Sequence, residues 1–245
     1  GYYINNYQKG LNVFINMNGE MVDHAVVTKS IIDENNLRTT TYENVNGNKR
    51  LNASFHVNNK FKLDSIKSIT VGGGVWGSLR RNVNFNNGIQ YLSKNNSIGP
   101  NIILEFSWLD AFEIESEYYW NLSGSRYDNR AFADRNFSTH DLQVEVRFTG
   151  IKNLEWNSSI NYRYNPDVQR GFQKTSWLWN STIQYAVLKD KGIISLKVYD
   201  LLNQNVNVRR SASENFIEDR QTSMLRRYVL FGFSYKFNTM KGGEG

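Results

Sequence analysis

Residues 101–122 read NIILEFSWLDAFEIESEYYWNL, and this stretch decides the fold of the chain. Apolar side chains occupy alternate positions on both sides of a central Leu-Asp-Ala: Ile102, Leu104, Phe106 and Trp108, then Phe112, Ile114, Tyr118, Trp120 and Leu122. A period of two is typical of a β-strand, because successive side chains point to opposite faces. The stretch therefore predicts two antiparallel strands joined by a short turn, each with one apolar and one polar face.

The same alternation recurs along nearly the whole chain, and no helical period competes with it. It predicts about ten strands, near 11–31, 39–60, 67–82, 99–108, 112–126, 139–148, 154–164, 174–188, 193–200 and 226–237. We therefore assign the chain to the all-β class, with an antiparallel up-and-down order.

Composition narrows the class of protein further. The chain has 245 residues, of which 40% are hydrophobic and 14% aromatic, with two prolines, no cysteine and a formal net charge of +6. So many aromatic residues are not typical of a disordered tail, and the missing cysteine excludes a disulfide scaffold or cysteine-ligated zinc. No apolar run reaches the roughly 18 residues of a membrane helix. The positive charge fits nucleic acid, anionic lipid or acidic substrates without choosing among them.

The connections between the predicted strands alternate between short and long. The turns at 61–66, 109–111, 149–153 and 189–192 are short, whereas those at 83–98, 127–138, 165–173 and 201–225 are long and polar. In an up-and-down sheet this order places all long loops at one end, as in an outer-membrane barrel. A soluble sandwich would show shorter strands and loops of mixed length.

Strand length and aromatic placement also favour a membrane barrel. Strands of about 10 residues cross a bilayer when tilted, and aromatic side chains gather at both membrane interfaces of such barrels. The candidate girdle residues are Trp108, Trp120, Trp156, Trp177, Trp179, Tyr228 and Phe237. We predict transmembrane β-barrel strands over 1–237, a polar C-terminal tail over 238–245, and a bacterial outer-membrane location.

Two stretches carry a family resemblance: ISLKVYDLLNQNVNVRRSASENFIEDRQTSMLRRYVLFGFSYKF at 194–237 and TTTYENVNGNKRLNASF at 39–55. They resemble the C-terminal strands of Bacteroidetes-type outer-membrane β-barrel proteins related to TonB-dependent receptors. That resemblance implies a barrel of about 22 strands, plugged by an N-terminal domain and energised from the periplasm. At about 24 residues a strand, such a barrel needs about 540 residues, so we expect less than half of it here and several hundred residues upstream. Phe237 matches the aromatic end of the terminal strand that barrel-assembly machinery recognises in such proteins.

Charged residues fall into two candidate groups. The polar faces of three predicted strands would line the lumen with Glu113, Glu115, Glu117, Glu145, Arg147 and Arg163, which could pair across strands, hold a plug or meet substrate. Arginines in or beside the long loops could meet lipopolysaccharide phosphates, because guanidinium binds phosphate with two parallel donors. The candidates are Arg80, Arg81, Arg209, Arg210, Arg226 and Arg227, and their alternative role is that of ordinary solvated loop charges.

Other sites are less well supported. His24, His56 and His140 are scattered without metal-ligand spacing, and we expect no metal and no cofactor. His140 and Asp141 are adjacent in a strand and so face opposite ways, which excludes a catalytic dyad there. The glycines at 72–74 lack the Gly-Lys-Ser/Thr of a phosphate loop and more plausibly permit curvature or close approach. Most aromatic residues alternate away from the charges, which argues against nucleic acid.

The function we predict is the barrel wall and outer loops of a TonB-dependent-receptor-like uptake transporter, without enzymatic activity. Its partners would be outer-membrane lipid and lipopolysaccharide, the rest of its own barrel and plug, and a TonB-type energy coupler or a surface lipoprotein. The main alternative is a non-transporting structural or docking barrel in a multi-protein outer-membrane complex. A lesser alternative is a small barrel enzyme, because ten strands is also the count of the omptin proteases.

Overall fold

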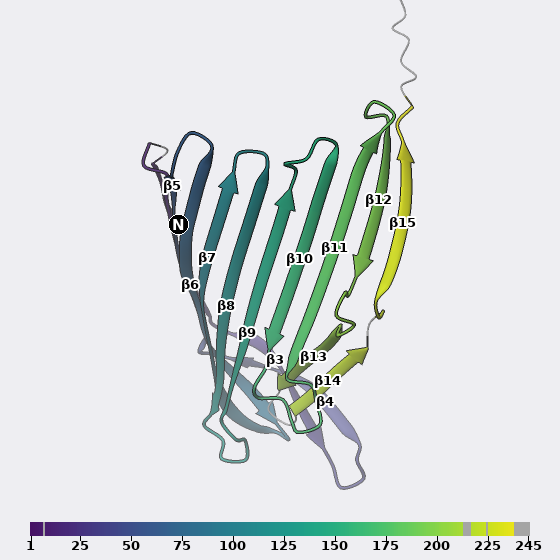
Figure 1. Cartoon of the computed structure of the whole chain (residues 1–245). Helices are drawn as coiled ribbons and strands as arrows, with labels where there is room; N and C mark the ends of the chain where they lie inside the picture. Colours follow the sequence, from purple (N-terminus) through teal and green to yellow (C-terminus); the bar gives the residue numbers. More distant parts are fainter. Residues whose placement is uncertain (7, 213–216, 224, 238–245) are drawn as a thin grey trace, which may run out of the picture.

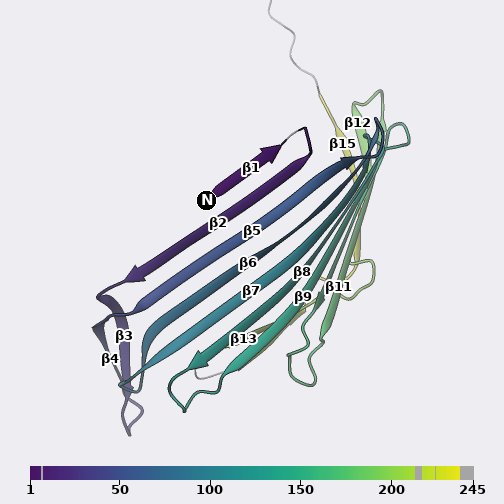
Figure 2. The ribbon, with the colours of Figure 1, turned by 90° about the vertical axis from the view of Figure 1, so that its left-hand side faces the viewer.

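The main body of the protein is one curved antiparallel sheet of eleven strands (Figures 1 and 2). The computed structural model describes residues 1–237 apart from 7, 213–216 and 224. In spatial order the strands are β1 (Tyr2–Asn6), β2 (Leu11–Val22), β5 (Asn48–Lys62), β6 (Lys67–Asn86), β7 (Ile89–Trp108), β8 (Phe112–Tyr127), β9 (Arg135–Phe148), β10 (Leu154–Tyr164), β11 (Thr175–Val187), β12 (Gly192–Tyr199) and β15 (Tyr228–Tyr235). The predicted all-β antiparallel class is confirmed, and each strand pairs with its neighbours in the chain except where a hairpin intervenes.

Two hairpins lie outside the main sheet. β3 (Ala25–Ile32) pairs with β4 (Arg38–Val45) between β2 and β5, and β13 (Val206–Ala212) pairs with β14 (Ile217–Ser223) between β12 and β15. Both extend from the end of the sheet opposite the short turns (Figure 1). We call this end the loop end and the other the turn end. The four predicted short turns, at 61–66, 109–111, 149–153 and 189–192, all lie at the turn end.

The strand prediction was wrong in five places, of which four are local. The predicted strand at 11–31 breaks at His24, which has a φ of 56° and donates its backbone N–H to Asn46 Oδ1 at 2.7 Å. Likewise, the predicted strand at 39–60 breaks at Gly47, which has a φ of 98°. β1 was not predicted, and the predicted loop at 201–225 contains β13 and β14.

The largest difference lies at 83–98, which is not a loop. β6 and β7 are each 20 residues long and meet in a two-residue turn at Asn87 and Gly88, with φ values of 48° and 81°. Asn-Gly is the preferred pair for a type I′ hairpin turn because both positions need a positive φ. Since a bilayer takes about 9–11 residues of a tilted strand, the loop-end half of this hairpin extends well beyond the length needed for a crossing.

The strand register gives the sheet one apolar and one polar face. One row across β6 to β10 consists of Val71, Leu104, Ser116, Val144 and Ile160, and the neighbouring row contains Glu105, Glu115 and Glu145. The apolar face is not covered by the described residues, and Leu104 and Phe231 are 50% and 72% exposed. An exposed apolar face of this extent indicates a surface that meets something other than water.

The buried apolar residues lie instead at the loop end and beside the loops. Tyr91 and Phe132 are buried, and their rings lie 4.8 Å apart, with the ring of Tyr127 beside both. β3 packs against β6 there, where Ile32 donates its backbone N–H to Asn87 Oδ1 at 3.0 Å. Among the described residues there is no helix with the length and apolar character that a membrane crossing requires.

Candidate functional site

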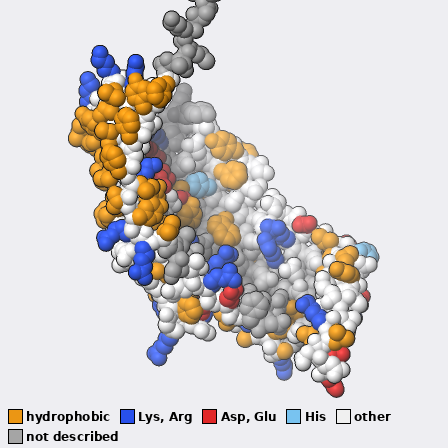
Figure 3. Space-filling model, turned by 90° about the vertical axis from the view of Figure 1, so that its right-hand side faces the viewer, with side chains coloured by type: hydrophobic (Ala, Val, Ile, Leu, Met, Phe, Trp, Pro, Cys, Tyr) orange, Lys and Arg blue, Asp and Glu red, His pale blue; other side chains and the backbone are white. Residues whose placement is uncertain are grey.

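The polar face is the first candidate site, and its centre is acidic. Seen from the β15 side, apolar side chains gather along the outer edge near β12 and β15, beside a hollow lined mainly by polar side chains (Figure 3). Glu105, Glu115 and Glu145 stand directly opposite one another on β7, β8 and β9. Like charges directly opposite on neighbouring strands are destabilising, so this glutamate row favours a positively charged partner in front of it.

Two arginines on the polar face form ion pairs. Arg147 Nε lies 3.3 Å from Glu155 Oε1, although Arg147 stands opposite Glu113 in the register. Arg163 Nε lies 2.5 Å from Asp141 Oδ1 on the neighbouring strand. All these side chains are more than a quarter exposed, so each pair contributes little stability. Among the described residues, no arginine or lysine forms an ion pair with a member of the glutamate row.

The structure places all six predicted lumen charges on this face: Glu113, Glu115, Glu117, Glu145, Arg147 and Arg163. Sequence reasoning left out Glu105, Asp141 and Glu155, which belong to the same surface. The alternation of its strand already places Glu105 on the polar face, although the predicted set of lumen charges did not include it. The pairing of Arg147 with Glu155 could not be predicted, because it depends on the rotamer of a long side chain.

Polar side chains line two depressions on the same face. One, of about 350 Å³, is bordered by Glu113, Glu145, Arg147 and Asn157, and the other, of about 440 Å³, by Tyr119, Gln143, Asn161 and Arg163. Tyr119 donates its hydroxyl to Glu117, which also accepts from Asn101 Nδ2 at 3.2 Å. Such amide, hydroxyl and carboxylate groups can hold polar or cationic ligands through hydrogen bonds.

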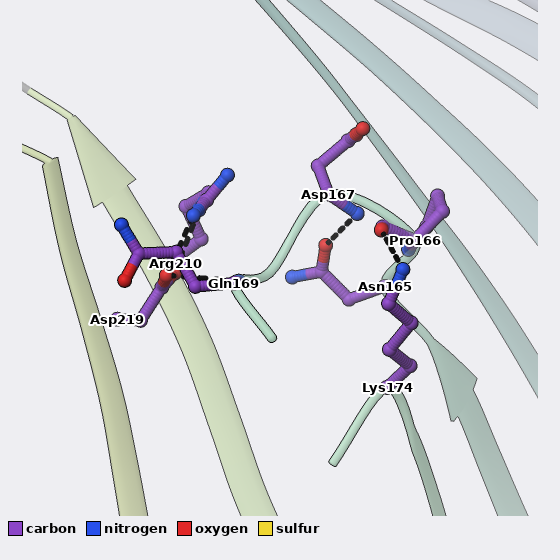
Figure 4. Close-up of polar contacts among 7 residues, drawn as sticks. All are labelled: Asn165, Pro166, Asp167, Gln169, Lys174, Arg210 and Asp219. Atoms are coloured by element: carbon purple, nitrogen blue, oxygen red, sulfur yellow. Dashed lines mark hydrogen bonds and ion pairs between the residues drawn. The ribbon is translucent and has the colours of Figure 1, made fainter. Parts of the chain in front are cut away.

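The loop end is held together by a buried ion pair (Figure 4). Arg210 on β13 donates Nε and Nη2 to the two carboxylate oxygens of Asp219 on β14, both at 2.6 Å. The same carboxylate accepts the backbone N–H of Gln169 at 3.1 Å, which attaches the hairpin to the β10–β11 loop. The hydrogen bonds between these two side chains lower the pKa of Asp219 and raise the pKa of Arg210.

The lowered pKa of Asp219 predicts the pH range over which the hairpin stays attached. The attachment is fully present above the ordinary aspartate pKa of about 3.9 and is lost as the pH falls through the lower folded value. We expect hydrogen exchange in β13 and β14, corrected for intrinsic rates, to be flat from neutral pH to about pH 4 and to rise only below it. Asp219→Asn should raise exchange at neutral pH. A wild-type rise between pH 6 and pH 5 would contradict this assignment.

The histidines lie far apart in the sheet. His56 is on the polar face of β5, His24 is in the bend after β2, and His140 is on the apolar face among aromatic rings, stacked on Trp120 with ring centroids 5.7 Å apart. Its neighbour Asp141 points to the polar face and pairs with Arg163. The described residues contain no group of three or more side chains suited to hold a metal ion.

The glycines at 72–74 lie in the middle of β6, between β5 and β7. A Cβ on Gly74 would come within 2.5 Å of the backbone oxygen of Phe55. The need for glycine at this position is therefore a close approach of the neighbouring strand backbone, and not of the plug or loop that the sequence suggested.

The structure separates the six candidate phosphate-binding arginines. Arg80 lies on the polar face opposite Arg50, whereas Arg81 lies on the apolar face opposite Lys49. Arg209 and Arg210 lie on β13, outside the main sheet. Arg226 and Arg227 are exposed between β14 and β15, and Arg227 donates Nη1 to Leu201 O at 3.3 Å.

The candidate girdle residues also divide between faces and ends. Trp108 and Trp156 lie at the turn end of the apolar face, and Trp120, Trp177 and Trp179 lie on the same face toward the loop end. Tyr228 stands opposite Tyr199 on the polar face, stacked on it with centroids 4.6 Å apart, so the sequence prediction misplaced it. Phe237 follows β15 and is exposed, and the predicted tail at 238–245 lies outside the described residues.

Comparison with known proteins identifies the family. Residues 77–235 match the outer membrane protein beta-barrel family. Neither a curated protein nor a solved structure matches the chain well enough to compare. The matched range runs from β6 to the end of β15 and covers well over half of the chain. The chain therefore belongs to the outer membrane protein beta-barrel family, and its place is the bacterial outer membrane.

Proposed function

We propose that the chain forms part of the wall of an uptake transporter of the TonB-dependent receptor kind, within a barrel of about 22 strands. The observation that carries this proposal is the open sheet. Its first and last strands, β1 and β15, are not paired with each other within the described residues. Unpaired backbone N–H and C=O groups cost several kcal/mol each in lipid. Further strands of the same barrel would satisfy both edges.

The acidic polar face supports a filled lumen. The row of Glu105, Glu115 and Glu145 faces the interior of the barrel, and Arg147, the cation beside it on β9, forms its ion pair with Glu155 instead. A plug that carries lysine or arginine would neutralise these carboxylates, and water alone would leave them repelling one another. This is the arrangement of a plugged transporter, in which the plug must move before a substrate can pass.

Single-cysteine labelling tests this proposal, because the chain has no cysteine of its own. Glu117→Cys and Asn161→Cys place a thiol on the polar face, and Leu104→Cys places one on the apolar face as a control. In cells of a Gram-negative host that carries the intact protein, we expect an external, membrane-impermeant maleimide to label the polar-face thiols. The labelling rate should change at least threefold when a protonophore removes the proton-motive force. The apolar-face control should stay unlabelled. A polar-face rate that does not depend on energy would contradict energised transport.

A second candidate function is docking within a multi-protein outer-membrane complex. It is favoured by the β3–β4 hairpin, which projects at the loop end and exposes Val26 and Tyr42 by 67% and 73%. An exposed apolar hairpin is suited to meet a partner such as a surface lipoprotein. Two results together would support this second function. Labelling of the polar face would not depend on energy, and a partner would co-purify only while Val26 and Tyr42 are intact. Neither function includes an enzymatic step.

A further inference from the structure

Four cationic side chains form a row on the apolar face of the sheet. Lys49 on β5 stands opposite Arg81 on β6, Arg81 opposite Lys94 on β7, and Lys94 opposite Arg126 on β8. All four are exposed. Neighbouring strands lie about 4.8 Å apart, so the row is about 14 Å long. We call these four residues the cation row.

The cation row lies at the loop-end border of the apolar face. On β8 the apolar stretch runs from Phe112 to Leu122, which is the length that crosses a bilayer at a tilt. Arg126 follows four residues later, on the same face. The long loops of an outer-membrane barrel are extracellular, so this position corresponds to the headgroup region of the outer leaflet.

The cation row is not neutralised by the protein itself. None of its four members takes part in an ion pair of the described residues. Glu20, the nearest carboxylate on β2, stands opposite Arg50 on the other face, and Asp134 after β8 accepts the backbone N–H of Tyr127. Four like charges on neighbouring strands repel one another, and an anion with several charges would remove that repulsion.

The surface beside the row is apolar. A depression of about 770 Å³ is bordered by the four cations and by Met21, Leu51 and Leu79, and Met21 and Leu79 are 62% and 57% exposed. Glu20, Arg50 and Arg80 also border it, although the register places their side chains on the other face. An inorganic anion would use only the cations. A lipid with phosphate on its headgroup would use both parts of the surface, since its acyl chains would cover the apolar residues.

We propose that the cation row is a binding site for the phosphorylated headgroup of an outer-leaflet lipid, the lipid A part of lipopolysaccharide. Arg81 and Arg126 offer two parallel donors to a phosphate, and Lys49 and Lys94 act as point charges between and beside them. Of the six arginines that the sequence suggested for this role, Arg81 alone belongs to the site. The site does not depend on whether the barrel transports a substrate.

The test compares two variants that remove charge from the same strands on opposite faces. The first replaces the cation row, K49Q/R81Q/K94Q/R126Q. The matched control is R50Q/R80Q, because Arg50 and Arg80 stand opposite each other on the polar face of β5 and β6. Each protein is extracted intact from a lipopolysaccharide-bearing outer membrane in mild detergent, and native mass spectrometry measures the fraction that carries bound lipid A. A shift in gel mobility on heating shows that each variant is folded.

We expect at least a tenfold loss of lipid A occupancy in the cation-row variant and none in the control. Occupancy that is equal in the two variants would overturn the proposal. A third variant, R226Q/R227Q, should retain its lipid, and loss there instead would assign the site to the loop arginines. In nanodiscs, lipid A should bind more tightly than its dephosphorylated form, and inorganic polyphosphate should compete only weakly. If polyphosphate binds as well as lipid A, the site is not a lipid site.

Discussion

Replacing Leu104 with arginine is expected to prevent most of the protein from assembling in the membrane. Leu104 lies near the middle of the apolar stretch of β7, between Val71 and Ser116 on the neighbouring strands, and half of it is exposed. An arginine on the lipid face near the bilayer centre costs about 2–4 kcal/mol. The measurement is the fraction of folded protein in the outer membrane, from the heat-dependent shift in gel mobility, and the urea midpoint of the refolded protein.

The control for this variant is Ile103→Arg, one residue away on the same strand. Ile103 lies on the polar face opposite Glu117, where a new arginine meets a carboxylate and water. We expect its stability to stay within about 1 kcal/mol of the wild type. Equal loss in the two variants would show that the face assignment is wrong, because a charge would then be harmful irrespective of its direction.

Replacing Asp200 with alanine is expected to destabilise the junction between β12 and the β13–β14 hairpin. Asp200 is 1% exposed, and its carboxylate accepts the backbone N–H groups of Gln204 at 2.9 Å and Asn205 at 3.1 Å. Alanine leaves both backbone N–H groups without this acceptor. Hydrogen bonds to charged groups contribute about 1.5–3 kcal/mol each, so we expect a loss of about 3 kcal/mol, measured as a lower urea midpoint.

Two further variants define the cause of that loss. Asp200→Asn keeps one acceptor oxygen and should recover about half of the lost stability. Asp190→Asn removes a charge from an exposed turn at the other end of the sheet, where the φ of 67° suits asparagine as well as aspartate, and should change little. If Asp200→Asn were as damaging as alanine, the charge rather than the second hydrogen bond would be responsible.

The sequence predicted the fold well wherever one face of a strand is apolar. Strands β8, β9 and β10 were placed within a few residues, because their alternation is regular from end to end. Apart from β1, which pairs with the turn-end half of β2, the prediction failed at the loop end, where both faces of a strand contact water or protein and the alternation disappears. The loop-end halves of β6 and β7 contain both Arg81 and Val83 on the apolar side, so they were taken for a loop although Asn87-Gly88 marks the turn.

The candidate sites were predictable to a smaller extent. Alternation alone was sufficient to place Glu113, Glu115 and Glu117 on one face. The cation row could not be found in this way, because its members come from four strands and are aligned only by the register. Lys49 and Lys94 are 45 positions apart in the chain yet lie on the two sides of Arg81. That alignment requires the lengths of the turns, which the sequence reasoning had wrong at 83–98.

The strict alternation of apolar and polar residues also affects how the protein reaches its membrane. A chain bound for the outer membrane first passes through the translocation channel of the inner membrane, which retains segments of about 20 apolar residues as helices. In β7 and β8 a glutamate, serine or asparagine interrupts the apolar residues every few positions, and the mean hydropathy of the chain is −0.57. The apolar surface exists only once the strands have formed. The unfolded chain can therefore cross one membrane as a polar polypeptide and reside in the next as a lipid-facing wall.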